Sequence, residues 1–165
     1  PIVSKSLIGY LPEGVPLYQD FSTMLYLKYI AEARQIEKSK ERIEEVISNL
    51  QLEDVKDVPI ETLSKGYKRR VGLAQSLIHD PKILILDEPT DGLDPLQKFE
   101  VRGLIKKLSK NKAIIISTHI LDEVPEVCNR CLIISNGEKR FEGTPTQLKR
   151  RKGKNLDEVF RGVVQ

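Results

Sequence analysis

Ile83-Leu84-Ile85-Leu86-Asp87-Glu88 is the stretch of sequence that decides the fold. Its four consecutive apolar residues predict a strand covered on both faces, because a strand with one solvated face alternates apolar with polar residues. Two carboxylates end this strand. Open parallel sheets place their ligand sites at the carboxyl ends of strands, so Asp87 and Glu88 are expected where chemistry takes place. Taken alone, such an acidic pair is equally typical of a turn or a helix cap.

Helices and strands alternate on both sides of this strand. A helix is predicted before it, over residues 64–78, and the apolar residues that follow it repeat at helical spacing, namely Val101, Leu104, Ile105 and Leu108. A second buried strand is predicted at 113–116 and a third strand at 132–134, with helices at 121–127 and 156–164. This alternation is typical of an α/β fold with a mainly parallel sheet.

The N-terminal part of the chain has a different pattern. Residues 8–16 predict a short strand that runs into a loop rich in Gly and Pro. Ser22 is a suitable N-cap for a helix that ends near Arg34. The next helix has one apolar stripe at i, i+3, i+4 and i+7, formed by Ile43, Val46, Ile47 and Leu50. We therefore expect a helical unit without strands between the first strand and Pro59.

Composition limits the possible functions only weakly. The chain has 165 residues, and its 27 Lys and Arg against 24 Asp and Glu give a formal charge of +3, too small to favour a nucleic-acid partner. No apolar run approaches the roughly 20 residues of a membrane-spanning helix, and no signal peptide is expected. Cys128 and Cys131 form a C-x-x-C pair, compatible with half a zinc site or a redox couple. Two thiols in a reducing compartment are favoured, because no second pair accompanies them.

Further polar motifs surround the acidic pair. Leu63-Ser64-Lys65-Gly66-Tyr67 opens the preceding helix, with Ser64 at a capping position and Gly66 allowing close approach of the backbone. The free N–H groups at a helix start form an anion site. Pro89-Thr90-Asp91-Gly92-Leu93-Asp94-Pro95 follows Glu88, and Ser117-Thr118-His119 follows the next strand.

In this order the motifs resemble those of the ABC ATPase family. LSKGY, ILILDEPTDGLDP, IISTH and ISNGE resemble its signature, Walker B, D-loop and H-switch, and Ile8-Gly9-Tyr10-Leu11-Pro12-Glu13 resembles its Q-loop. The resemblance runs from about Ile8 to Val164. The variants LSKGY and GYLPE, with LDEVF near the end, are most similar to bacterial exporter ATPases that pair with ABC-2-type permeases.

The resemblance implies a P-loop NTPase-like fold, with a mainly parallel sheet, helices on both faces and an all-helical subdomain. It implies four parts of the chain: a strand and Q-loop (1–16), a helical signature subdomain (17–79), the Walker B, D-loop and H-switch part of the core (80–148), and a basic linker with a C-terminal helix (149–165). The basic run at 149–154 is interpreted as a solvated linker, with contact to anionic lipid as the alternative.

The resemblance also implies roles for four residues in catalysis and metal binding. Asp87 would be the Mg²⁺-associated carboxylate and Glu88 the general base for water, while His119 would contact the γ-phosphate. Glu13 occupies the position of the Q-loop glutamine. A carboxylate is a competent Mg²⁺ ligand, so Glu13 is expected to contribute to the metal site.

Five more residues are implied to bind ATP. Ser64 and Gly66 would bind the γ-phosphate of ATP held by the opposite subunit, and Asp94 would communicate between the two ATP sites of a dimer. Lys65 and Tyr67 complete the signature. They depart from the family, since Lys65 replaces a glycine and Tyr67 stands where glutamine is common. Lys65 would either add a cation beside the γ-phosphate or lie in solvent.

One family motif is missing from the 165 residues. No G-x-x-x-x-G-K-[ST] occurs, although Gly9 and Gly14 have the spacing of its glycines, because Val15 and Pro16 follow where Lys and Ser or Thr are needed. The resemblance implies that this loop lies upstream in the sequence. The strand that leads to it would lie in the sheet between the strands at residues 113–116 and 132–134. We therefore expect a fragment of an ATPase domain, inactive by itself, less soluble than the intact domain, and without tight ATP binding.

The sequence leads to one main functional hypothesis. The chain is expected to belong to an ATP-hydrolysing subunit that uses ATP and Mg²⁺, pairs with a second ATPase subunit and a transmembrane permease, and lies on the cytoplasmic face of the membrane. One alternative is a truncated module that docks on a permease or dimer partner without turnover. Another is a soluble ABC protein acting on ribosomes or DNA, which is less favoured because nothing in the chain is duplicated.

Overall fold

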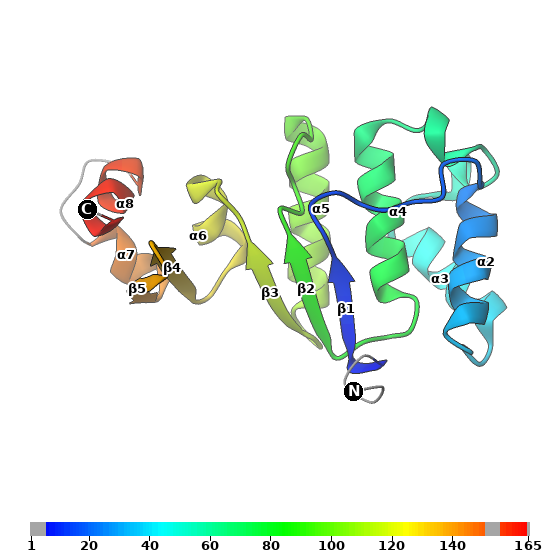
Figure 1. Cartoon of the computed structure of the whole chain (residues 1–165), viewed down its shortest axis with the longest axis horizontal. Helices are drawn as coiled ribbons and strands as arrows, with labels where there is room; N and C mark the ends of the chain where they lie inside the picture. Colours follow the sequence, from blue (N-terminus) through cyan, green and yellow to red (C-terminus); the bar gives the residue numbers. More distant parts are fainter. Residues whose placement is uncertain (1–5, 151–155, 165) are drawn as a thin grey trace. The chain divides into compact units, whose positions relative to one another are not determined.

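The computed structural model of the chain describes residues 6–150 and 156–164. They form two compact units that divide after Ser117. The first unit contains a parallel sheet and most of the helices, and the second contains a hairpin with short helices (Figure 1).

Three parallel strands form the sheet of the first unit. They are β1 (Ile8–Leu11), β2 (Ile83–Asp87) and β3 (Ala113–Ser117), in the order β1-β2-β3. Leu11 lies opposite Leu86, and Asp87 lies opposite Ser117. All three strands therefore end at the same edge, as their arrowheads show in Figure 1. The predicted parallel α/β core is confirmed.

The two faces of this sheet differ in burial. Leu11, Leu84 and Leu86 are fully buried, whereas Tyr10 and Ile115, which point to the other face, are 51% and 59% exposed. The strand predicted at residues 113–116 is confirmed as β3, but its predicted burial on both faces is wrong within the described residues. Alternate side chains of β3 are exposed there because a strand presents successive residues to opposite faces.

Helices of the first unit follow their predicted positions. The segment between β1 and β2 contains α2 (Thr23–Ala33), α3 (Ser39–Asn49), the 3₁₀ turns η1 (Glu53–Val55) and η2 (Ile60–Thr62), and α4 (Lys65–Leu77). Ser22 caps α2 by accepting a hydrogen bond from the Leu25 amide at 3.2 Å. The apolar stripe of α3 is buried as predicted.

Helix α4 packs closely against β1. A Cβ added to Gly9 on β1 would lie 2.1 Å from the carbonyl oxygen of Ser76 on α4, and one added to Gly72 would lie 2.8 Å from Leu11 Cδ1. Gly9 lets the helix and strand backbones approach directly, and Gly72 leaves room on the helix for the side chains of Leu11 and Val15. Helix α4 is thus fixed directly to β1.

The last helix of the first unit, α5 (Pro95–Leu108), connects β2 to β3. Val101 and Ile105 of its predicted stripe are buried. Asp94 is its N-cap in a capping box with Gln97, and Pro95 occupies the first helical position. The start of α5 is therefore fixed at Asp94.

The second unit contains η3 (Leu121–Glu123), α6 (Val124–Val127), β4 (Cys131–Ser135), β5 (Glu138–Gly143), α7 (Pro145–Lys149) and α8 (Leu156–Val164). Its core is formed by Ile133, Phe141, Leu148 and Val159. Residues 132–134 are a strand as predicted, but β4 pairs antiparallel with β5 rather than joining the parallel sheet. The turn explains this, because Asn136 and Gly137 both have positive φ, as a tight hairpin requires.

Both cysteines lie in the second unit as free, partly buried thiols. Burial raises the pKa of both thiols, which disfavours the reactive thiolate. Cys131 packs against the core of this unit. The basic run at 149–154 falls mostly outside the described residues.

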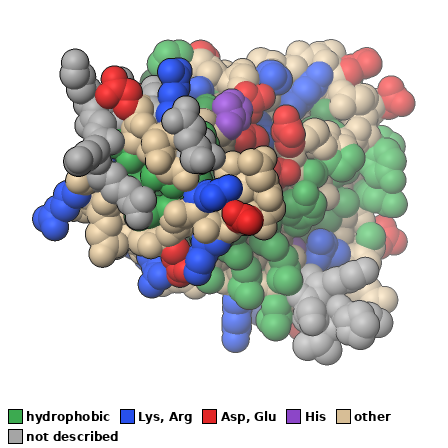
Figure 2. Space-filling model, turned by 60° about the vertical axis from the view of Figure 1, so that its left-hand side comes forward, with side chains coloured by type: hydrophobic (Ala, Val, Ile, Leu, Met, Phe, Trp, Pro, Cys, Tyr) green, Lys and Arg blue, Asp and Glu red, His purple; other side chains and the backbone are tan. Residues whose placement is uncertain are grey.

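Acidic and basic side chains are interspersed on the face shown in Figure 2, with exposed hydrophobic side chains among them. Among the described residues, no helix is both long enough and apolar enough to cross a membrane.

Candidate functional site

The acidic pair lies at the carboxyl edge of the parallel sheet. Asp87 is the last residue of β2, and Ser117, directly opposite, is the last residue of β3. The Ser117 hydroxyl donates a hydrogen bond to Asp87 Oδ1. The Glu88 amide donates to the Ser117 carbonyl at 3.0 Å. Strand β3 thus fixes both the first carboxylate and the backbone of the second.

Glu88 has a strained backbone. Its φ is 46°, in the left-handed region that non-glycine residues seldom adopt. The Asp91 amide donates to the Glu88 carbonyl at 3.1 Å, so the chain turns sharply directly after the strand. Strain of this kind costs about 1–3 kcal/mol and is concentrated at functional sites. Asp80 and Asn136 adopt the same conformation at ordinary turns, so the backbone of Glu88 marks a tight turn and does not by itself indicate a function.

Glu13 follows β1 at the same edge of the sheet, and its side chain is exposed. Its backbone is fixed through its carbonyl oxygen, which accepts a hydrogen bond from Arg69 at 2.6 Å. The backbone of Glu13 thus lies at the edge where Asp87 and Glu88 end β2, and its role at a metal site stays a prediction.

Arg69, on α4, is a residue of this site that sequence analysis missed. It is only 5% exposed, and its guanidinium donates to the main-chain oxygens of five residues, Pro12, Glu13, Asp87, Glu88 and Pro89. Burial lowers its pKa, and the carboxylates of Asp91, Asp87, Glu13 and Glu88 oppose this shift. The helical spacing of α4 could have predicted that Arg69 is buried. Arg69 lies three residues after Gly66 and four before Leu73, so all three share the buried face of the helix.

The signature segment forms the start of α4. Ser64 is the N-cap, and its hydroxyl accepts a hydrogen bond from the Tyr67 amide at 3.3 Å. Lys65 Nζ lies 3.9 Å from Asp91 Oδ2, with both side chains largely exposed, so this ion pair is weak. A Cβ on Gly66 would lie 2.5 Å from the Gln97 side-chain amide. The signature segment therefore contacts the D-loop segment within one chain.

Two other predicted ATP-binding residues have structural partners. The Asp94 carboxylate accepts a hydrogen bond from the Gln97 amide at 2.9 Å, which caps α5. The Tyr67 ring lies 5.6 Å from the guanidinium carbon of Arg70, a cation–π distance. Both side chains therefore have contacts within this chain.

His119 belongs to the second unit. It is exposed in the bend that follows β3, next to Thr118, whose hydroxyl accepts a hydrogen bond from the Ile120 amide at 3.0 Å. The first unit, by contrast, contains all the segments that carry the other predicted site residues: Glu13, Asp87, Glu88, Asp94 and Ser64–Tyr67. The role implied for His119 stays a prediction.

The oxygen donors at the edge fit Mg²⁺. No group of three or more His, Cys, Asp or Glu side chains within residues 6–150 and 156–164 forms a ready metal cluster. Mg²⁺ seldom needs one, since it keeps several waters and binds through one or two carboxylates together with substrate phosphates. The Asp87 carboxylate beside the Ser117 hydroxyl suits such an ion.

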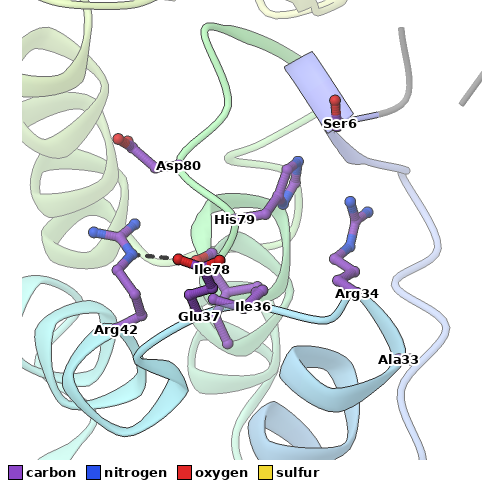
Figure 3. Close-up of a pocket in the computed structure, with 9 residues that line it drawn as sticks. All are labelled: Ser6, Ala33, Arg34, Ile36, Glu37, Arg42, Ile78, His79 and Asp80. Carbon is purple, nitrogen blue, oxygen red and sulfur yellow. Dashed lines mark hydrogen bonds between the residues drawn. The ribbon is translucent and has the colours of Figure 1, made fainter. Parts of the chain in front are cut away.

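A cavity of about 580 Å³ lies at the opposite edge of the sheet, where Ser6 precedes β1 and Asp80 precedes β2 (Figure 3). Arg34, Arg42 and His79 also line it. The Arg42 side chain donates to the Ile78 carbonyl at 3.2 Å, and His79 Nε2 lies 3.0 Å from the Ile8 carbonyl oxygen. No predicted site residue lines this cavity.

Sequence comparisons agree with the motifs. A family model described as ABC transporter matches residues 4–91. The chain is 36% identical over 156 residues to the ABC transporter ATP-binding protein YxlF of Bacillus subtilis, covering 93% of this chain and 53% of YxlF. It is 34% identical over 169 residues to the Nod factor export ATP-binding protein I of Rhizobium sp. (strain N33), covering 99% of this chain and 55% of that protein. The chain spans about half the length of these relatives.

Solved structures agree as well. An ATP-binding subunit of an ABC transporter matches all of this chain and 71% of its own, with a TM-score of 0.84 at 26% identity. CbiO1 from Clostridium perfringens, part of the ABC transporter complex cbiONQ, matches 96% of this chain and 63% of its own, with a TM-score of 0.77 at 29% identity. The P-loop NTPase-like fold class is thereby confirmed. With the ordered motifs at the sheet edge, these matches establish that the chain belongs to the ABC transporter family of ATP-binding proteins.

Proposed function

We propose that this chain carries the catalytic and signature elements of an ATP-hydrolysing subunit of an ABC transporter. The observation that carries the proposal is the edge at which β1, β2 and β3 end. Glu13 and the Asp87–Glu88 pair lie there on backbone fixed by Arg69 and Ser117, beside the signature helix. Ligand sites of open parallel sheets lie at this edge.

Each residue of the site has a proposed role. Asp87 and Glu13 hold Mg²⁺, and Ser117 orients the Asp87 carboxylate. When bound, Mg²⁺ neutralises charge on the phosphates. Glu88 accepts a proton from the attacking water.

The other roles concern ATP itself. His119 donates a hydrogen bond to the γ-phosphate. Ser64 to Tyr67 bind ATP held by a second ATPase subunit, and Asp94 reports the state of one site to the other.

A permease is the proposed membrane partner, and the proposed location is the cytoplasmic face of the membrane. The names of two similar proteins support this, since one is a Nod factor export protein and the other belongs to the complex cbiONQ. The proposed docking face is an aromatic cluster at the start of α2, in which the Tyr18 ring lies 5.3 Å from those of Phe21 and Tyr29. Tyr18, Leu25 and Tyr29 are exposed on it.

The division into four functional parts is also proposed. Residues 17–79 would move as the helical signature subdomain against the core, and residues 80–148 would carry the Walker B, D-loop and H-switch. Residues 1–16 would link the two through the Q-loop, and residues 149–165 would follow as linker and helix.

The substitution Glu88→Gln in the intact gene product tests this function. The amide keeps the shape of the carboxylate but cannot accept the proton, so ATP hydrolysis should slow by roughly 10²-fold or more while nucleotide binding persists. Turnover is measured by phosphate release and binding by calorimetric titration. Near-normal hydrolysis by this variant would remove Glu88 from its role. A wild-type protein that binds a permease but hydrolyses no ATP would instead favour the docking module without turnover.

The 165 residues on their own are proposed to bind Mg-ATP weakly and to be less soluble than a complete domain. They contain no phosphate loop with its lysine, which supplies most contacts to the β- and γ-phosphates. Their exposed Ile115 also lies on β3, an edge strand of the described sheet. Calorimetric titration of the purified chain measures the affinity, and saturable micromolar binding would contradict the expectation.

A further inference from the structure

We propose that Arg69 is the positioning residue of this site, and that it joins the Q-loop segment to the Walker B acids through main-chain oxygens. The inference rests on the proposed ATPase function for its consequence and on the observed contacts for its geometry. Arg69 lies on α4, whereas its partners follow β1 and end β2. One side chain therefore connects the signature helix with both acidic segments.

All the donors of Arg69 are used in this connection. A guanidinium has five N–H donors in a fixed planar fork. Nε donates to the Pro89 carbonyl at 3.3 Å, and Nη1 donates to those of Pro12 and Glu13 at 2.9 and 2.6 Å. Nη2 donates to the carbonyls of Asp87 and Glu88. No other side chain can satisfy five acceptors, because lysine has three donors and glutamine two.

Charge adds to this geometric role. Glu13, Asp87, Glu88 and Asp91 all act electrostatically on Arg69. Its hydrogen bonds go to main-chain oxygens, so the carboxylate oxygens of Glu13 and Asp87 are not occupied by the guanidinium. A buried cation near these carboxylates reduces their mutual repulsion. Because the guanidinium binds main-chain oxygens, it does not compete with a ligand for the carboxylate oxygens of Glu13 and Asp87. Arg69 thus supports the acidic edge without binding the carboxylates of Glu13 and Asp87.

The consequence concerns the direction of the side chains. Fixing the two peptide planes that flank a residue fixes the direction in which its side chain leaves the backbone, and Arg69 binds the carbonyls of both planes that flank Glu13 and Glu88. Arg69 fixes the peptides of Glu13, Asp87 and Glu88 against each other. Loss of Arg69 is expected to weaken catalysis more than ATP binding, since a misplacement near 1 Å costs on the order of 10²-fold in rate.

The test compares Arg69→Ala with wild type in the intact gene product. We expect kcat for ATP hydrolysis to fall on the order of 10- to 100-fold, with KM for ATP nearly unchanged. Methylguanidine added to this variant should restore part of kcat, because it fills the vacated space with the same donors. A merely structural role would lower the folded fraction and would not respond to methylguanidine.

A second readout needs no nucleotide. In Arg69→Ala, hydrogen exchange of the amides of residues 13–14, 88 and 90–92 should accelerate relative to wild type, while exchange within α3 stays unchanged. Arg42→Ala is the matched control, since Arg42 also donates to main-chain carbonyls, those of Leu77 and Ile78, but at the other end of α4. The control should leave kcat and exchange at the acidic edge unaltered.

The outcomes separate this inference from the proposed function. An inactive wild type would contradict the function, and the exchange measurement would still decide the inference. An active wild type with equal kcat in Arg69→Ala, or unchanged exchange of the amides at 13–14, 88 and 90–92, would overturn the inference. If Arg69→Ala does not fold, Arg69→Lys, which keeps the charge but only three donors, is expected to show the same pattern more weakly, and wild-type behaviour in it would also overturn the inference.

Discussion

The Ser117 hydroxyl donates a hydrogen bond to Asp87 Oδ1, so the last side chains of two neighbouring strands hold each other at the edge of the sheet. In metal sites, partners of this kind orient the ligand, and their removal commonly weakens metal affinity about 10–100-fold. The pair therefore allows a specific test of the proposed Mg²⁺ site.

We expect Ser117→Ala to raise the Mg²⁺ concentration for half-maximal ATP hydrolysis by about tenfold, because the Asp87 carboxylate loses its orienting donor. Mg²⁺ titration of the hydrolysis rate measures this. Ser109→Ala is the control, since the Ser109 hydroxyl donates only to the Lys106 carbonyl at the end of α5. Equal Mg²⁺ dependence in both variants would separate Ser117 from the metal site.

Two glycines should respond oppositely to a methyl group. Gly9→Ala places a Cβ 2.1 Å from the Ser76 carbonyl oxygen, so helix and strand must separate, and the free energy of unfolding should fall by about 2 kcal/mol or more. A Cβ added to Gly103 on α5 would meet no atom within 4 Å. Gly103→Ala should therefore raise the free energy of unfolding by up to about 1 kcal/mol, because alanine has a higher helix propensity than glycine. Denaturant titration measures both. A Gly9→Ala variant as stable as wild type would contradict the close packing of α4 on β1.

His79 should make stability depend on pH. Burial lowers its pKa, and Arg34 and Lys112 add to this, against the opposing effects of the Ile8 carbonyl and Asp80. The folded chain thus binds fewer protons than the unfolded chain near the ordinary pKa of about 6.5. The stability that this group contributes is complete above that pH and is lost as the pH falls through the lowered value.

Denaturation between pH 7.5 and pH 5, about the range in which histidine titrates, tests this effect. In His79→Gln an amide N–H can still donate to the Ile8 carbonyl, but the group no longer titrates. Its stability should therefore fall less on acidification than that of wild type. Identical pH dependence in the two proteins would show that other groups cause the acid sensitivity.

The aromatic cluster of α2 should be needed for assembly. Leu25→Glu and Tyr29→Glu place charges on exposed apolar positions, so permease recovery in a pull-down should fall while basal ATP hydrolysis persists. Phe99→Glu is the control, because Phe99 is an exposed apolar residue on a different helix, α5. Recovery that is insensitive to the α2 substitutions would place the docking face elsewhere.

Local patterns were sufficient to predict most of the elements. Apolar runs and helical spacing predicted β2, the stripe of α3 and the capped start of α4, because these depend on residues close in sequence. Strand β5 was missed although Asn136-Gly137, a strong hairpin signal, precedes it. Its residues Glu138 to Gly143 alternate too weakly in hydrophobicity to predict a strand by themselves.

Arg69 was missed for a different reason. Its five acceptors come from two segments that lie far from it in sequence, so no local pattern predicts the contact. A buried position within the basic run Lys68-Arg69-Arg70 is visible only from the phase of the helix. The exposure of Ile115 likewise depends on which elements cover the sheet, which tertiary structure decides.

The pairing of β1 with β2 also constrains the order of folding. Ile8 pairs with Ile83, so the whole of α2, α3 and α4 is synthesised between two strands that must meet. Contacts within α2 and α3 are local and form early, whereas closing a loop of this length costs entropy before any strand contact compensates for it. During synthesis, β1 therefore cannot pair with β2 until α2, α3 and α4 have been synthesised. Because Gly9 approaches the Ser76 carbonyl oxygen closely, β1 can pack against α4 before β2 is available to pair with it.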